Sequence, residues 1–171
     1  PEKGKYGTGL VFLPKDKTEQ DKILKVMIEV IEAEGLNLMK LRDVPTNPAC
    51  LGKVALESEP DIKQVFITGV SNEDAPNLER KLYVIRKKIE NQVNHKDFYI
   101  VSLSSKNIIY KGMLSSMQVR DYFDDLRDTY FTSGLALVHS RFSTNTFPTW
   151  SLAQPFRLLC HNGEINTVRG N

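Results

Sequence analysis

Two clusters of polar side chains near the end of the printed sequence carry the residue types best suited to chemistry. The first, HSRFSTN at 139–145, follows the apolar run LALV at 135–138, and the second, CHNGE at 160–164, follows a mostly apolar run at 156–159. Each apolar run is predicted to be a buried strand. If the two strands end beside each other, both clusters reach one edge of a sheet, where loops on a rigid scaffold often carry binding groups.

The two clusters offer complementary chemistry. Arg141 is a permanent cation whose planar fork can bind a carboxylate through two hydrogen bonds, and Thr144 and Asn145 add neutral donors and acceptors. In Asn162-Gly163, a side-chain amide stands next to a backbone N–H that no Cβ shields, which suits the stabilisation of a developing negative oxygen. An isolated Asn-Gly is more often a simple turn, so this interpretation depends on the first cluster lying nearby.

The same two clusters carry a family resemblance. HSRFST at 139–144, followed by HNGEI at 161–165, resembles the paired signature of the class II glutamine amidotransferases. The longer stretch 139–171 resembles the glutaminase domain in the large subunit of glutamate synthases. Weaker similarity extends upstream, through YGTGLVFLP at 6–14, LRDVP at 41–45 and FYIVSLSSKNIIYKGML at 98–114. The resemblance therefore spans nearly the whole chain.

The resemblance implies a role for each polar residue. Arg141 would hold the α-carboxylate of glutamine, and Thr144 and Asn145 would help to seat the amino acid. The side chain of Asn162 and the backbone N–H of Gly163 would stabilise the tetrahedral oxyanion. By resemblance, the chain therefore carries a substrate-binding set and an oxyanion-stabilising set at one site.

The nucleophile of the family is a cysteine at the mature N-terminus, whose own α-amine acts as the base. This sequence starts Pro1-Glu2-Lys3 instead, and an acidic residue with which the family holds the substrate amine would fall beyond Asn171. We therefore expect an interior piece of one amidotransferase domain, with half of the glutamine site in 98–171 and no glutaminase activity of its own.

The resemblance also implies a reaction and a parent enzyme. Glutamine would be hydrolysed to glutamate and ammonia through a γ-glutamyl thioester, and the ammonia would pass to a synthase domain of the same parent chain for reductive amination of 2-oxoglutarate. That parent enzyme would be an oxidoreductase of ammonia assimilation. It would contain FMN and an iron–sulfur cluster, use NAD(P)H or ferredoxin as its electron source, and bind a small reductase subunit. No cofactor site is expected in this chain.

Composition narrows the remaining function classes. The 171 residues are 40% hydrophobic and 26% charged with a net charge of +2, which is typical of a globular domain and unlike the concentrated basic face of a nucleic-acid-binding protein. No apolar run is long enough for a membrane span. Two distant cysteines, Cys50 and Cys160, favour a reduced, cytoplasmic setting. Together with the three histidines, they show no zinc-ligand spacing.

The expected fold is α+β, with the layered αββα packing of the N-terminal-nucleophile amidotransferases. In the first half of the chain, the pattern predicts strands at 10–13, 36–41 and 62–68 and helices at 18–31 and 77–93. Residues 98–113 are predicted to be a β-hairpin, and a helix is predicted to begin with a capping box of Ser115 and Gln118. This order suggests a split βαβ unit, so we hypothesise a ferredoxin-like sub-lobe at 6–100 within one domain at 1–171.

Other residues could suggest chemistry, but a structural role is favoured for each. Nothing near Cys50 in the sequence would lower the pKa of its thiol. Cys160 and His161 are neighbours on a predicted strand and so point to opposite faces, and His139 is better explained as a core histidine. The adjacent pair at 124–125 diverges around its predicted helix and is interpreted as part of a solvated face.

Two rival functions remain open. A non-catalytic amidotransferase-like scaffold would bind an amino acid or a partner domain, and the absence of the N-terminal cysteine from the printed sequence is its best support. A glutaminase that feeds another synthase, in glucosamine-phosphate or phosphoribosylamine formation, is disfavoured by the long match over 145–171.

Overall fold

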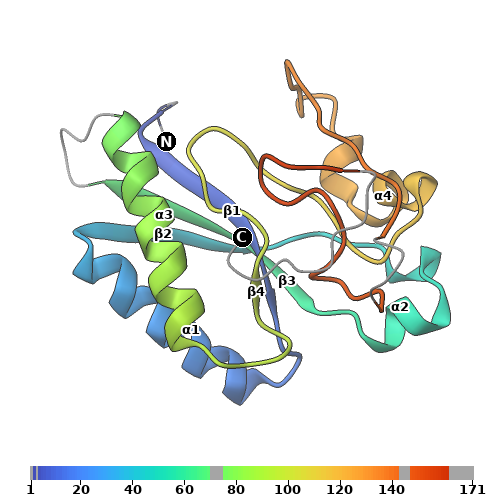
Figure 1. Cartoon of the computed structure of the whole chain (residues 1–171), viewed down its shortest axis with the longest axis horizontal. Coiled ribbons are helices and arrows are strands. Elements are labelled where there is room, and N and C mark those ends of the chain that lie inside the picture. The colour runs from blue at the N-terminus through green and yellow to red at the C-terminus, as the bar shows by residue number, and fades with distance from the viewer. Residues whose placement is uncertain (1, 3, 70–74, 143–146, 162–171) are drawn as a thin grey trace. The chain divides into compact units, whose positions relative to one another are not determined.

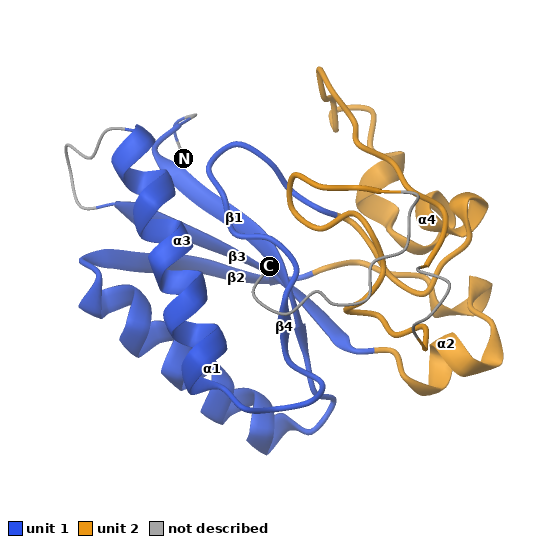
Figure 2. Ribbon diagram, in the orientation of Figure 1, with its two compact units in different colours: residues 1–43, 60–109 blue, residues 44–59, 110–171 orange. Residues whose placement is uncertain are grey.

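The computed structural model describes residue 2 and residues 4–69, 75–142 and 147–161. The chain divides into two compact units, coloured separately in Figure 2. Unit 1 consists of residues 1–43 and 60–109, and unit 2 consists of residues 44–59 and 110–171. Each unit is therefore assembled from two separate stretches of the sequence.

Unit 1 is organised around a four-stranded antiparallel sheet (Figure 1). Its strands lie in the spatial order β2-β3-β1-β4 and are β1 (Tyr6–Leu13), β2 (Leu36–Asp43), β3 (Asp61–Gly69) and β4 (Tyr99–Ile100). β1 and β3 pair along the whole of β1, from Tyr6 opposite Thr68 to Leu13 opposite Asp61. These two long strands are the centre of the unit.

Two long helices, α1 (Lys17–Ala33) and α3 (Ala75–Gln92), pack on this sheet. α1 begins where the side chain of Asp16 accepts a hydrogen bond from the backbone N–H of Glu19 at 2.9 Å, and ends just before Gly35, whose φ of +72° favours glycine. Alternate residues of each strand point to the same face. There they meet both helices in one apolar core, which includes Val11, Leu13, Ile31, Val65, Ile67, Leu82 and Ile85. None of the described helices is both long and apolar enough to cross a membrane.

The sequence of elements in unit 1 is β1-α1-β2-β3-α3-β4, which with this strand order is the split βαβ arrangement. All six elements of the hypothesised sub-lobe lie in unit 1, which extends to residue 109 and leaves out 44–59. The prediction of a mixed α+β fold is confirmed. The described residues contain this one sheet, and the packing of a second sheet against it in αββα layers stays a prediction.

The predicted hairpin at 98–113 is wrong. β4 is only two residues long, and beyond it the chain continues along β1, where Thr8 and Ser104 exchange backbone hydrogen bonds of 2.9 and 3.0 Å. The Glu79 carboxylate of α3 then accepts hydrogen bonds from Ser104 Oγ (2.6 Å) and from the backbone N–H and hydroxyl of Ser105 (both 2.7 Å). Burial alone would raise the pKa of Glu79, but these donors outweigh it and hold the pKa below its ordinary value. The expected turn is thus bound by a helix.

Unit 2 contains only short helices among its described residues. They are η1 (Pro48–Cys50), α2 (Lys53–Glu57), α4 (Ser116–Tyr122) and η2 (Asp124–Arg127). α4 begins with the predicted capping box, in which the Gln118 backbone N–H donates to Ser115 Oγ at 3.4 Å and the Ser115 backbone N–H donates to Gln118 Oε1 at 2.9 Å. This predicted helix start is confirmed.

An aromatic cluster forms the core of unit 2. Tyr122 and Phe123 are fully buried, with ring centroids 4.8 Å apart in an edge-on arrangement, and the Trp150 ring lies 5.4 Å from that of Tyr122. The Trp150 indole N–H donates to the carbonyl of Ala55 at 3.1 Å. Gly112 lies so close to the indole that a Cβ there would come within 2.4 Å of it. Trp150 therefore fixes the start of the segment that leads to the second polar cluster.

Candidate functional site

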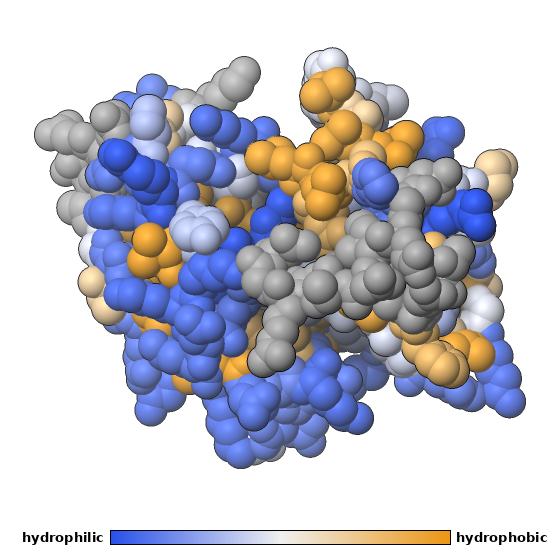
Figure 3. Space-filling view, viewed as in Figure 1, coloured by the Kyte–Doolittle hydropathy of each residue, from blue (hydrophilic) through white to orange (hydrophobic). Residues whose placement is uncertain are grey.

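The first apolar run, 135–138, is not the buried strand that its composition predicts. Leu135, Leu137 and Val138 are 78%, 45% and 81% exposed, respectively. An extended segment becomes a strand only when a neighbour satisfies its backbone groups, and no described segment pairs with this one. These residues belong to the exposed hydrophobic side chains of unit 2, a class drawn in orange in Figure 3.

The second apolar run, 156–159, is a tight turn instead of a strand. The backbone N–H of Phe156 donates to the Leu159 carbonyl at 2.7 Å, and the N–H of Leu159 donates back at 2.8 Å. Between them Arg157 has a φ of +52°, which is uncommon for a residue with a Cβ. The reciprocal hydrogen bonds reverse the chain direction, so the strand prediction is wrong here too.

Arg141 is the one predicted site residue that lies within the described part of the chain. Its side chain is exposed, as a group that binds a substrate carboxylate requires, and its backbone N–H donates to Nδ1 of His139 at 3.1 Å. His139 thus caps the local chain in the first cluster. Thr144, Asn145, Asn162 and Gly163 lie outside the described residues, so whether the two clusters converge stays a prediction.

Gln154 holds the chain at the entrance to the second cluster. Its side-chain oxygen accepts a hydrogen bond from the backbone N–H of His161 at 2.8 Å, and its side-chain nitrogen donates to the His161 carbonyl at 3.1 Å. Gln154 is 8% exposed. One side chain therefore satisfies both backbone groups of the residue that precedes Asn162. The sequence does not predict this contact, because a single glutamine beside Pro155 is typical of an ordinary loop.

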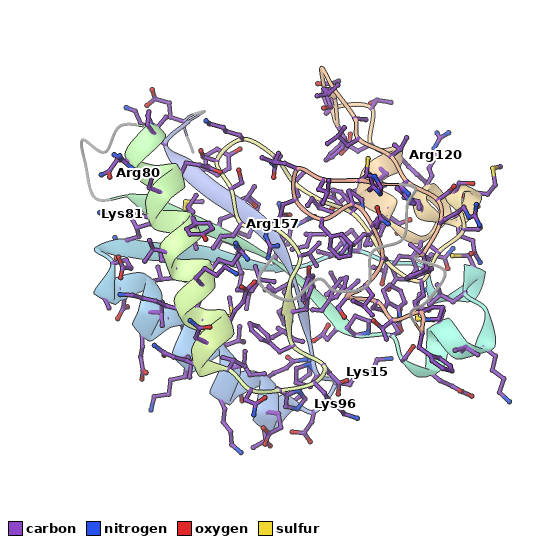
Figure 4. All side chains as sticks on the ribbon, viewed as in Figure 1. Lys15, Arg80, Lys81, Lys96, Arg120 and Arg157 are labelled. Atoms are coloured by element: carbon purple, nitrogen blue, oxygen red, sulfur yellow. The ribbon has the colours of Figure 1, made fainter. Side chains whose placement is uncertain are left out.

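Lys111, from an earlier part of the chain, contacts the same segment at Ser151 and Phe156. Its ammonium group donates to the Ser151 carbonyl at 2.8 Å and lies 4.5 Å from the centroid of the Phe156 ring. The residue is buried. Burial, and to a smaller extent the positive charge of Arg157 (labelled in Figure 4), lowers the pKa of Lys111 to about 7. Sequence reasoning missed this lysine because it lies in the run that was predicted to be a hairpin strand.

Both cysteines are free thiols. Cys50 donates to the Asn47 carbonyl at 3.2 Å, and burial raises the pKa of its thiol. Cys160 is half-buried. In the described ranges, no group of three histidine, cysteine or acidic residues could hold a metal ion.

The basic residues of α3 do not form a concentrated binding face. Arg86 donates to both carboxylate oxygens of Glu90 at 3.0 Å, and Lys88 pairs with Glu34 of α1. Arg80 and Lys81 lie near the start of the helix (Figure 4). Acidic partners thus neutralise part of the positive charge of this helix.

Comparison with known sequences identifies the family. The whole chain, residues 1–171, matches the family of class II glutamine amidotransferases. The chain therefore belongs to the class II glutamine amidotransferases.

Similar proteins include several glutamate synthases. The chain is 53% identical over its full length to part of the glutamate synthase [NADPH] large chain of Bacillus subtilis (strain 168), of which it covers 11%. Over 96% of its length it is 43% identical to the chloroplastic ferredoxin-dependent glutamate synthase of Spinacia oleracea, covering 10% of that protein. It is 42% identical over its full length to glutamate synthase [NADH] of Saccharomyces cerevisiae, covering 8%. The chain thus spans about a tenth of the length of these relatives.

Proposed function

We propose that this chain supplies the glutamine-binding and oxyanion-stabilising half of a glutaminase site in a glutamate synthase. The observation that carries the proposal is the match of the whole chain to the class II glutamine amidotransferases, with HSRFST at 139–144 and HNGEI at 161–165. The names of the relatives support glutamate synthase as the parent enzyme.

In this proposal the first cluster binds the substrate. The exposed guanidinium of Arg141 forms two hydrogen bonds with the α-carboxylate of glutamine, and Thr144 and Asn145 orient the amino acid. Binding through the carboxylate leaves the side-chain amide of glutamine free to face the second cluster.

The second cluster stabilises the reaction's negative charge. A cysteine thiolate attacks the amide carbon of glutamine, and the carbonyl oxygen becomes an oxyanion that accepts hydrogen bonds from the Asn162 side chain and the Gly163 backbone N–H. The oxyanion re-forms the carbonyl as the C–N bond breaks, and the nitrogen leaves as ammonia with the proton that the cysteine's α-amine took from the thiol. Water then hydrolyses the γ-glutamyl thioester to glutamate and the free thiol. The family nucleophile is an N-terminal cysteine, and burial raises the pKa of the Cys50 thiol, so we place the nucleophile outside 1–171.

The ammonia passes, in the same proposal, to a synthase domain of the parent chain, where reductive amination of 2-oxoglutarate gives glutamate. FMN, an iron–sulfur cluster and a small reductase subunit are assigned to that part of the enzyme. An iron–sulfur cluster takes about four cysteine ligands, and this chain has two cysteines, so its residues do not fit one. The free, half-buried thiols support a reduced, cytoplasmic setting.

The proposal is tested by measuring glutamine hydrolysis in two proteins. One is the polypeptide 1–171, and the other is the full-length protein encoded by the gene that contains this sequence. We expect ammonia and glutamate in equal amounts from the full-length protein and none from 1–171. Hydrolysis by neither would support the non-catalytic scaffold instead, and hydrolysis by 1–171 alone would move the nucleophile to Cys160.

A further inference from the structure

Gln154 makes a pair of contacts in which one side-chain amide binds both backbone groups of a single residue, His161, seven positions further along the chain. The hydrogen bonds to the N–H and C=O of His161 measure 2.8 and 3.1 Å. Two antiparallel hydrogen bonds of this kind imitate one rung of a strand pair. They fix both the position of His161 and the rotation of its backbone about the chain direction.

The contact bears directly on the predicted oxyanion site. The carbonyl of His161 is part of a planar peptide unit that includes the N–H and Cα of the next residue. Holding that carbonyl therefore restrains one end of the peptide unit that leads into the predicted Asn162–Gly163 donor pair. Oxyanion donors act through preorganised geometry. A displacement of such a donor by about 1 Å can reduce the rate of the reaction about a hundredfold.

Gln154 can restrain the chain because its own segment is held firmly. Trp150 at one end donates its indole N–H to the Ala55 carbonyl at 3.1 Å. The Lys111 ammonium group binds the Ser151 carbonyl at 2.8 Å and lies over the ring of Phe156 at the other end. The backbone that carries Gln154 thus has a fixed point on each side.

The chemistry of the contact requires an amide. A glutamine offers a donor and an acceptor on one group, which matches the acceptor and donor of the His161 backbone. An ionised glutamate has acceptors only, and one of its oxygens would face the His161 carbonyl. A methionine has a similar length and no strong hydrogen-bonding group, so it would leave two backbone groups without this partner.

We propose that Gln154 is a positioning residue for the Asn162–Gly163 oxyanion donors, acting through its two hydrogen bonds to the His161 backbone. This inference rests on the proposed glutaminase function. It adds to that function a residue that does not touch the substrate and determines how well the developing charge is stabilised.

The first test uses Gln154→Met in the full-length protein. We expect kcat for glutamine hydrolysis to fall about tenfold or more, with KM within about twofold, because Arg141 still binds the ground state. In the Asn162→Ala background the same substitution should cost less than in the wild type, since only the Gly163 N–H is left to be positioned. Fully additive losses in the double variant, or a rise in KM alone, would contradict a positioning role.

Gln154→Glu gives a signature that general loss of structure would not. A protonated carboxyl group has one donor and one acceptor, so it can replace the amide, whereas the carboxylate cannot. The activity of Gln154→Glu relative to the wild type should therefore recover as the pH falls, and that of Gln154→Met should not. Parallel pH profiles for both variants would count against the role.

Gln20→Met is the matched control. Gln20 is a buried amide of unit 1 that donates to the Pro14 carbonyl at 2.7 Å, so its loss also removes a buried contact between a side chain and the backbone. We expect Gln20→Met to lower the melting temperature and to leave kcat and KM within about twofold of the wild type. An equal fall of kcat in both variants would show that reduced stability alone explains the effect.

Amide hydrogen exchange tests the contact separately from the proposed function. Peptides that cover 155–165 should exchange faster in Gln154→Met than in the wild type, and Gln20→Met should not change them. Unchanged exchange in Gln154→Met would overturn the inference even if the wild type hydrolyses glutamine. Faster exchange in a protein that hydrolyses no glutamine would instead refute the proposed function and leave Gln154 as a support of the backbone at His161.

Discussion

The ammonium nitrogen of Lys111 lies 4.5 Å from the centroid of the Phe156 ring, and its pKa is lowered to about 7 by burial and by the nearby charge of Arg157. The ring face attracts the cation, while removal from water disfavours it. A group that supports the segment of Gln154 is therefore close to losing its charge at neutral pH. The stability of the protein should depend on this balance.

Lys111→Met tests that dependence. In the unfolded chain the lysine has its ordinary pKa of 10.5, so between about pH 7 and pH 10.5 the unfolded state binds more protons than the folded state, and the folded state gains stability as the pH rises. Methionine lacks this titration. The free energy of unfolding of the wild type, minus that of the variant, should increase by up to about 1.4 kcal/mol per pH unit from pH 7 to 9. Denaturant titrations at each pH measure it.

The control for this prediction is Lys25→Met, at an exposed position of α1. If the difference from the wild type changed with pH no more for Lys111→Met than for Lys25→Met, the lysine would not be held in the buried environment that the structure gives it.

Gly9→Ala should destabilise the protein because the backbone of Ser102 occupies the place of a side chain. A Cβ at Gly9 would lie 1.6 Å from the Ser102 carbonyl oxygen, and a backbone atom of a neighbouring segment cannot rotate away. We expect a loss of about 3 kcal/mol in the free energy of unfolding, measured by denaturant titration. Gly134→Ala, where no atom lies within 4 Å of the added Cβ, should stay within about 0.5 kcal/mol of the wild type. Equal effects would contradict the close approach of the two backbones.

The elements of unit 1 were predictable because local pattern and final packing agree. The apolar side chains of α1 recur at helical spacing, and Ile23, Met27 and Ile31 are all buried in the structure. Strands 36–41 and 62–68 were predicted and appear as β2 and β3. Each of these elements is long enough for its periodicity to decide between helix and strand.

The segments around the site were not predictable in the same way. The apolar runs at 135–138 and 156–159 are only four residues long, and a run of that length does not specify whether a partner strand exists. The 156–159 turn is set by reciprocal backbone hydrogen bonds, and the contact of Gln154 with His161 joins residues through a side chain. Neither kind of contact leaves a periodic pattern. The family motifs predict a site in these segments, where no periodic pattern does.

Arg141→Lys should raise KM for glutamine about tenfold or more in the full-length protein, with a smaller effect on kcat. A lysine keeps the positive charge but cannot form the two parallel hydrogen bonds of a guanidinium with a carboxylate, and a lost hydrogen bond to a charged group costs about 1.5–3 kcal/mol. Steady-state kinetics with glutamine measures the change. Arg120→Lys, at an exposed arginine near the end of α4 (Figure 4), should leave KM unchanged. An unchanged KM in Arg141→Lys would remove Arg141 from the substrate site.

Asn162→Ala should act mainly on kcat. If its side-chain amide donates to the oxyanion, the interaction is stronger in the transition state than in the bound substrate, so its loss lowers kcat about a hundredfold or more and leaves KM nearly the same. Asn91→Ala, at an exposed position of α3, is the control and should retain both values. Steady-state rates of ammonia release from the full-length protein give the comparison. A rise in KM without a fall in kcat would place Asn162 among the groups that bind glutamine and would leave the Gly163 N–H as the oxyanion donor.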